Sequence, residues 1–193
     1  YMNILKILTQ YIYCLSYFEL ALFVAAASVI CVAVNSFLYK YSWWRYILIA
    51  IGTVYTMLLL YITLLGRTEP IVNSISLVPF ESYIDYLNGA QEMLRTCIMN
   101  IFLFYPLGLV LGALLTKQKL WKLLLAWAAC FGLSVIIELS QYIFSIGYAE
   151  VDDVINNTIG SALGISVMRA GTALVLYIKE KLHKITAINN LED

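Results

Sequence analysis

The sequence predicts an all-α fold, a polytopic bundle of about five transmembrane helices with further helices at the membrane interface. Composition is the first reason, because 62% of the 193 residues are hydrophobic and only 12% are charged. An average soluble domain is roughly 45–50% apolar and about 25% charged. This composition argues against a soluble enzyme and a disordered chain. The 12 basic residues are balanced by 12 acidic ones, so no basic excess favours nucleic acid as a partner.

Long apolar stretches are the second reason, since a helix needs about 20 mostly apolar residues to cross a bilayer. The expected spans are Leu20–Leu38, Tyr46–Leu65, Cys97–Leu115, Leu120–Phe144 and Val154–Ile178. Tyr1–Ser16 is shorter and carries Lys6 and Gln10, so we expect an interfacial helix there. The alternative is a short sixth span. We divide the chain into an N-terminal part (1–65), a part that contains the polar motifs described below (66–178) and a tail (179–193).

The distribution of Lys and Arg is the third reason, and it also predicts the orientation. Cytoplasmic loops of membrane proteins carry an excess of these residues. The segments that alternate onto one side contain Lys40, Arg45, Lys117, Lys119, Lys122, Lys179, Lys181 and Lys184. We therefore expect this side to be cytoplasmic, with the amino terminus outside and the carboxy terminus inside.

The outer loop from Gly66 to Thr96 is the longest connection between spans. Phe80, Tyr83, Ile84 and Leu87 recur within it at helical spacing, and Asn88-Gly89 is a helix-stop signal. We expect a short amphipathic helix that lies on the outer membrane surface. An ordinary interfacial loop is the alternative.

Five polar side chains within the predicted spans or directly at their ends are the candidate site residues, because such groups are costly in a bilayer and need a reason. They are Asn100, Glu138, Gln141, Asp153 and Asn157. The predicted topology places all five in the outer half of the membrane, and Arg67 and Arg95 flank them at the outer surface. The set therefore predicts one polar site that opens outward. The alternative is a buried network that only holds helices together.

Small residues accompany the polar ones in the last three spans. Gly108 and Gly112 share a strip with Asn100, and Gly160 and Gly164 continue the face of Asp153 and Asn157. Such strips let helix backbones approach closely, so we expect spans three, four and five to pack together through them. At the start of span five, Asp152 or Asp153 is expected to cap its own helix. Arg169, in the inner half, is expected to extend toward the headgroups.

Several segments, taken in order, resemble the VanZ family, which is named for teicoplanin resistance in Gram-positive bacteria. They are Leu65-Gly66-Arg67, Ser76–Phe80, an N-x-x-x-F-x-P-x-G run at 100–108, an E-x-x-Q pair at 138–141 and an acid-x-x-D-x-x-x-N-x-x-G run at 150–160. The resemblance covers about residues 66–168. It implies a multi-pass protein of the bacterial plasma membrane that lowers susceptibility to teicoplanin-like lipoglycopeptides. The functional residues that it implies are Arg67, Asn100, Glu138, Gln141, Asp153 and Asn157. One position departs from the family, because Glu150 stands where Asp is usual.

Three classes of function remain open at this stage. A binding protein would hold a lipid-tailed ligand in an outer-leaflet pocket: a membrane lipid, a lipoglycopeptide antibiotic or a cell-wall lipid intermediate, with Arg67 or Arg95 on an anionic head. A membrane enzyme would use Glu138 as general acid or base and Asp153 as a second carboxylate or metal ligand. A transporter is disfavoured because no internal repeat is visible. The four cysteines have no metal-site or disulfide spacing, so we predict no metal and no cofactor; the oligomeric state stays open.

Overall fold

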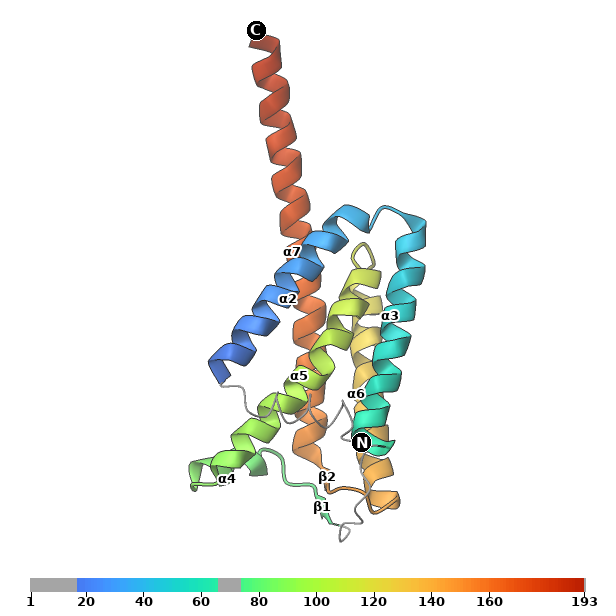
Figure 1. Cartoon of the computed structure of the whole chain (residues 1–193), viewed down its shortest axis with the longest axis vertical. Coiled ribbons are helices and arrows are strands. Elements are labelled where there is room, and N and C mark those ends of the chain that lie inside the picture. The colour runs from blue at the N-terminus through green and yellow to red at the C-terminus, as the bar shows by residue number, and fades with distance from the viewer. Residues whose placement is uncertain (1–16, 66–73, 193) are drawn as a thin grey trace, which may run out of the picture.

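A computed structural model describes residues 17–65 and 74–192 of the chain. Figure 1 shows a bundle of long helices with a short two-stranded sheet at one end. The elements in chain order are α2 (Tyr17–Leu38), α3 (Ser42–Leu60), a π-helical turn η1 (Tyr61–Leu65), β1 (Ile75–Ser76), α4 (Glu81–Leu87), α5 (Gln91–Leu114), α6 (Leu120–Ile143), β2 (Ala149–Glu150) and α7 (Val151–Glu192).

Five of the described helices are long and apolar enough to cross a membrane, as the sequence predicts. They cover Glu19–Leu38, Ser42–Leu65, Gln91–Leu114, Leu120–Ile143 and Val151–Thr186. Large apolar side chains point outward from the bundle: Phe23 is 71% exposed and Tyr46 is 74% exposed. Surfaces of this kind are stable when they face lipid. The protein is therefore an all-α membrane protein. The predicted interfacial helix at Tyr1–Ser16 lies outside the described residues.

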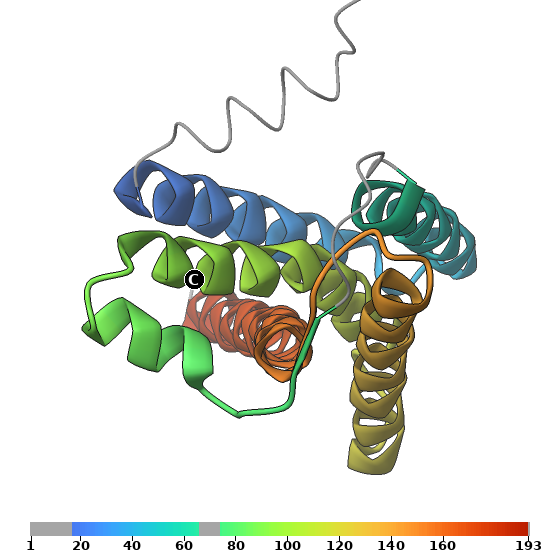
Figure 2. The same cartoon turned by 90° about the horizontal axis from the view of Figure 1, so that it is seen from below.

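The closest helix pair is α5 against α7, and glycines make the contact possible (Figures 1 and 2). A Cβ atom added to Gly160 would overlap the Ile101 carbonyl, and one added to Gly164 would overlap the Tyr105 carbonyl. Gly108 and Gly112 of α5 meet the α7 backbone in the same way, and a Cβ on Gly112 would lie 2.9 Å from the carbonyl oxygen of Ile165. We call this contact the glycine seam.

The glycine seam confirms the expected packing for spans three and five but not for span four. Helix α6 joins α7 through side chains instead: the Trp127 indole donates to the Thr158 carbonyl at 3.1 Å, and the Asn157 amide donates to the Ser134 hydroxyl at 2.9 Å. The one glycine in the middle of α6, Gly132, has no atom within 4 Å of an added Cβ. Helix α6 is therefore held less closely than the seam.

A buried amide ties the other end of the bundle together. Asn35 of α2 is 1% exposed; its amide nitrogen donates to the hydroxyls of Thr116 and Thr172, and its oxygen accepts from the Trp44 indole. These bonds join α2, α3, the α5–α6 connection and α7. In a bilayer no water replaces such bonds, so Asn35 fixes how the helices meet at this end.

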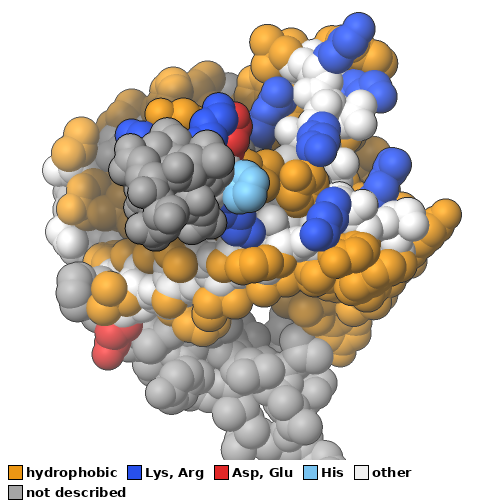
Figure 3. Space-filling model, turned by 90° about the horizontal axis from the view of Figure 1, so that it is seen from above, with side chains coloured by type: hydrophobic (Ala, Val, Ile, Leu, Met, Phe, Trp, Pro, Cys, Tyr) orange, Lys and Arg blue, Asp and Glu red, His pale blue; other side chains and the backbone are white. Residues whose placement is uncertain are grey.

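The two ends of the bundle differ in charge. The α2–α3 and α5–α6 connections and the last part of α7 lie at one end, while α4, β1 and β2 lie at the other (Figure 1). The structure therefore groups the connections as the sequence predicts. Lys and Arg side chains gather at the first of these ends (Figure 3), which we call the Lys-rich end; the opposite one is the site end. Helix α7 continues past Ile178 without a break and extends beyond the bundle.

The expected amphipathic helix is present at the site end as α4. Its apolar side chains point away from the protein, with Phe80, Ile84 and Leu87 exposed by 55%, 51% and 80%. The helix ends at Asn88, and Gly89 takes a positive φ of 110°, a conformation that glycine adopts without strain. An exposed apolar face on a short helix at the end of a membrane bundle fits the membrane surface.

Candidate functional site

The site end is organised by the first turns of α7, where two acids and two amides follow each other as Asp152-Asp153-x-x-Asn156-Asn157. Residues four apart on a helix lie on one side, and neighbouring residues are about 100° apart. The run therefore makes two acid–amide pairs that face different elements. One pair holds α4, and the other faces α5 and α6.

Asp152 and Asn156 form the pair that holds α4. The Asp152 carboxylate accepts the backbone N–H of Phe80 at 2.5 Å and that of Ser82 at 2.8 Å, and Asn156 accepts the Tyr83 hydroxyl at 2.5 Å. Phe80 has a left-handed backbone, with φ of 65°. Asp152 thus caps the start of α4, where a carboxylate satisfies backbone donors and favours the helix dipole. These bonds join Asp152 to a distant segment rather than to the first turn of its own helix.

Asp153 and Asn157 form the second pair, and they contact different helices. The Asn100 amide of α5 donates to the Asp153 carboxylate at 2.5 Å. Asn157, which is 3% exposed, donates to Ser134 of α6. The second pair therefore lies where α5, α6 and α7 meet.

Glu138 and Gln141 of α6 connect that helix to the loops at the site end. Glu138 is 6% exposed, and its carboxylate accepts the backbone N–H of Glu150 at 3.2 Å. Gln141 donates to the Thr63 carbonyl in η1 at 3.1 Å. A π-helical turn leaves main-chain groups outside the regular helix pattern, and Gln141 satisfies one of them. The two residues thus hold β2 and the end of α3 against α6.

A pocket of about 260 Å³ opens beside Glu138, between α6, α7 and the two strands. Its walls are apolar and include Leu77, Phe131, Val135 and Ile155. The two strands pair in parallel, Ile75 with Ala149 and Ser76 with Glu150, and Ile75, Ala149 and Glu150 are among the residues that line the pocket. Glu138 and Glu150 are the two acidic residues among those that line this apolar pocket.

The electrostatics of the site end are acidic. Burial raises the pKa of Glu150, and the neighbouring carboxylates of Asp152, Glu81 and Asp85 raise it further. Burial also raises the pKa of Tyr83 to about 12, with Cys97 and Asp152 adding to the rise, while its hydrogen bond to Asn156 opposes it. Tyr83 therefore stays a neutral donor at any physiological pH. Among the described residues, no three His, Cys, Asp or Glu side chains are grouped so that they could hold a metal ion.

Comparison with known proteins places the chain in a family. The VanZ/LLP1 family profile matches residues 52–176, which contain all the site residues described above. The chain belongs to the VanZ/LLP1 family. Protein VanZ of Enterococcus faecium is 34% identical over 94 residues, which make up 49% of this chain and 52% of that protein. The chain thus spans about half the length of the curated relative that it matches. No solved structure matches it.

Membership of the VanZ/LLP1 family confirms the resemblance drawn from the motifs. The structure brings four of the implied residues to one end of the bundle around α7: Asn100, Glu138, Asp153 and Asn157, with Gln141 one turn from Glu138. Arg67 lies outside the described residues. Arg95 lies against the ring of Tyr17 at 5.9 Å and does not line the pocket beside Glu138.

Two residues that tie the site end together escaped sequence reasoning: Asn156 and Tyr83. Tyr83 was read only as part of an apolar face, although its hydroxyl is bound to Asn156 across 73 residues. The signal was available in the doubled acid–amide run, because Asp152 and Asn156 repeat the spacing of Asp153 and Asn157 one position earlier. A second acid–amide pair at that spacing predicts a second element packed against α7.

Proposed function

We propose that this VanZ/LLP1-family protein lowers susceptibility to teicoplanin-like lipoglycopeptides by binding a lipid-tailed ligand in the pocket beside Glu138. The observation that carries the proposal is the position of that pocket. Its walls are apolar, and Glu138, one of the motif residues through which the chain resembles the VanZ family, is among the residues that line it. Ligand sites commonly combine apolar walls with a few convergent polar groups.

The proposal places the site end at the outer leaflet of a bacterial plasma membrane. The support is the Lys and Arg bias, which marks the opposite end as cytoplasmic. The site end carries Glu81, Asp85, Glu150 and Asp152 instead. In this orientation the pocket opens where an extracellular antibiotic or an outer-leaflet cell-wall intermediate enters the membrane.

The shape and charge of the pocket define the ligand class. About 260 Å³ is below the roughly 300–1,000 Å³ of sites for whole drug-sized molecules, so it suits an acyl chain and leaves the head group at the membrane surface. Carboxylates are hydrogen-bond acceptors when ionised. The head group that Glu138 and Glu150 recognise therefore presents N–H or O–H donors.

The test is antibiotic susceptibility in a teicoplanin-sensitive Gram-positive host that expresses the protein. Glu138→Gln preserves shape and removes the titratable carboxyl, and we expect it to abolish the reduced susceptibility. Glu92→Gln is the matched control, because it makes the same chemical change at an exposed carboxyl of α5, and it should behave as wild type. Membrane abundance is measured for each variant. Full protection by Glu138→Gln at normal abundance would refute a role for this carboxylate.

A second variant separates binding from a purely structural role. Val135 lines the pocket and is only partly buried, so Val135→Phe fills the pocket without touching the polar network. We expect it to lower binding of a fluorescent lipoglycopeptide to purified protein in detergent, while thermal stability stays near that of wild type. Unchanged binding would place the ligand elsewhere.

A further inference from the structure

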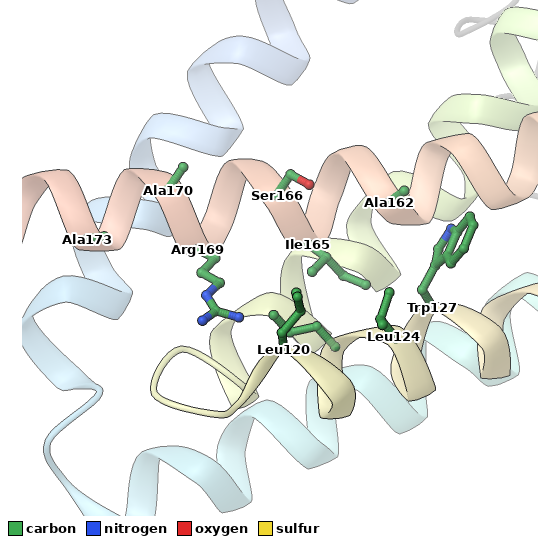
Figure 4. A pocket seen from close by; sticks show the side chains of 10 residues that line it. Leu120, Leu124, Trp127, Ala162, Ile165, Ser166, Arg169, Ala170 and Ala173 are labelled. Carbon is green, nitrogen blue, oxygen red and sulfur yellow. The ribbon is translucent and has the colours of Figure 1, made fainter.

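A larger hollow lies at the Lys-rich half of the bundle, between α6 and α7. It has a volume of about 620 Å³ and is walled by Leu120, Leu124, Trp127 and Ile165 (Figure 4). Ala162, Ala170 and Ala173 of α7 keep it open because their side chains are small. This groove shares no lining residue with the pocket beside Glu138, and no residue of the VanZ-like motifs was assigned to it.

Arg169 is the one charged side chain that lines the groove. It comes from α7 within the membrane span and points across the groove toward the start of α6 near Leu120 (Figure 4). One guanidinium nitrogen, Nη1, is buried and has no hydrogen-bond partner in the part of the chain that the structure describes. The side chain thus crosses the groove toward the end of α6 that lies at the Lys-rich end of the bundle, the end whose headgroups the sequence predicts it to reach.

An arginine inside a membrane span is costly unless an anion or several acceptors meet it. Its planar group with five donors binds phosphate well and keeps its charge at all relevant pH values. The groove supplies apolar walls below this cation but no carboxylate. The partner that completes the arrangement thus has an anionic head and an apolar tail.

We propose that the groove binds an anionic phospholipid of the leaflet at the Lys-rich end, with its phosphate on Arg169 and one acyl chain along Leu124 and Trp127. Trp127 lies seven residues below Leu120 on α6, which is about 10 Å at 1.5 Å per residue. The chain therefore runs from the headgroup level into the hydrocarbon. Lys119, which directly precedes the groove residue Leu120, adds positive charge near the start of α6. This inference does not rest on the proposed function or on which side is cytoplasmic.

The experiment is native mass spectrometry of the full chain purified in mild detergent. The probe is an equimolar mixture of phosphatidylglycerol and phosphatidylcholine with identical acyl chains, so that only the head groups differ. We expect wild type to retain phosphatidylglycerol over phosphatidylcholine by about fivefold or more, as an added basic contact implies. Arg169→Gln should reduce this preference to near unity. Lys181→Gln, which removes a charge from the exposed last part of α7, should leave it unchanged.

Two further measurements locate the lipid and keep the proposal falsifiable. Ser166→Phe fills the groove without altering Arg169, and it should reduce retention of both lipids. If Arg169→Gln fails to fold, Arg169→Lys is measured in its place. It keeps the positive charge, so it should retain part of the preference for phosphatidylglycerol. Displacement of phosphatidylglycerol by inorganic phosphate at equal concentration would show a headgroup-only site and overturn the acyl-chain assignment. An unchanged preference for phosphatidylglycerol in Arg169→Gln would overturn the proposal. So would a wild-type protein that is a lipid-free dimer and that Arg169→Gln converts to a monomer.

Discussion

The glycine seam gives the sharpest test of the fold, through Gly160→Ala. An added Cβ would overlap the Ile101 carbonyl of α5, and a backbone atom has no rotamer by which to move away. Overpacking usually costs about 1–3 kcal/mol, and we expect the upper end of that range because α5 and α7 must separate. Replacing a helical glycine by alanine also favours the helix by about 1 kcal/mol, which opposes the loss.

Gly132→Ala is the matched control because it separates the packing cost from the gain in helix propensity. It has the same helix-propensity gain, and nothing lies within 4 Å of its added Cβ. The difference in unfolding free energy between the two variants therefore isolates the seam, and we expect about 3 kcal/mol in favour of Gly132→Ala. The assay is equilibrium or thermal unfolding in mild detergent. Equal stability of the two variants would refute the close approach of α5 and α7.

Three other predictions concern the site end and the orientation. Asp152→Ala should free the start of α4 at a cost of about 2–4 kcal/mol, because the backbone donors of Phe80 and Ser82 lose a charged acceptor; protease sensitivity of the outer loop measures this. Glu150→Gln should stabilise the protein at pH 7 but not below about pH 4, as measured by thermal unfolding. In single-cysteine variants, an impermeant thiol reagent should label position 88 but not position 118 in intact cells.

The sign of the Glu150 effect follows from its raised pKa. The folded state holds the proton more tightly than the unfolded state, so stability is lost as pH rises through the interval between the two pKa values. Below that interval both states are protonated, and wild type and Glu150→Gln should be equally stable. Glu92→Gln serves as the control, because it makes the same chemical change at an exposed carboxyl. If Glu150→Gln raises the thermal stability at pH 4 as much as at pH 7, this argument is contradicted. Separately, labelling of position 118 but not of position 88 would contradict the predicted orientation.

The spans were predictable because the bilayer imposes a simple rule on sequence. About 20 apolar residues are needed to cross it, and the ends of the predicted and observed spans differ by only a few residues for α2, α3 and α6. Helix α7 begins at Val151, before the predicted Val154, since the acids and amides of its first turns are satisfied by neighbours rather than by water. The glycine strips likewise predicted the seam, because close approach demands small residues on both helices.

The pairing within the site was less accessible to sequence reasoning. Helical spacing placed Asp153 and Asn157 on one face, yet Asp153 binds Asn100 of α5 and Asn157 binds Ser134 of α6. A face wide enough for two neighbours does not reveal which residue meets which helix. The contact between Asp152 and α4 spans about 70 residues, and its partners are backbone N–H groups that carry no side-chain signature. Tertiary contacts of this kind depend on how loops fold over the bundle.

The groove at Arg169 and the pocket beside Glu138 both lie between α6 and α7, and the packing gives a reason. Helices α5 and α7 pack with their backbones in close contact at glycines, whereas α6 meets α7 through side chains such as Trp127 and Asn157. Contacts made by long side chains keep helix axes further apart than contacts between backbones. Space therefore remains above and below these contacts, and it forms the groove at Arg169 and the pocket at Glu138. Because α6 lines both, a ligand that shifts α6 at one end changes the room available at the other, so occupancy of the two sites should be coupled.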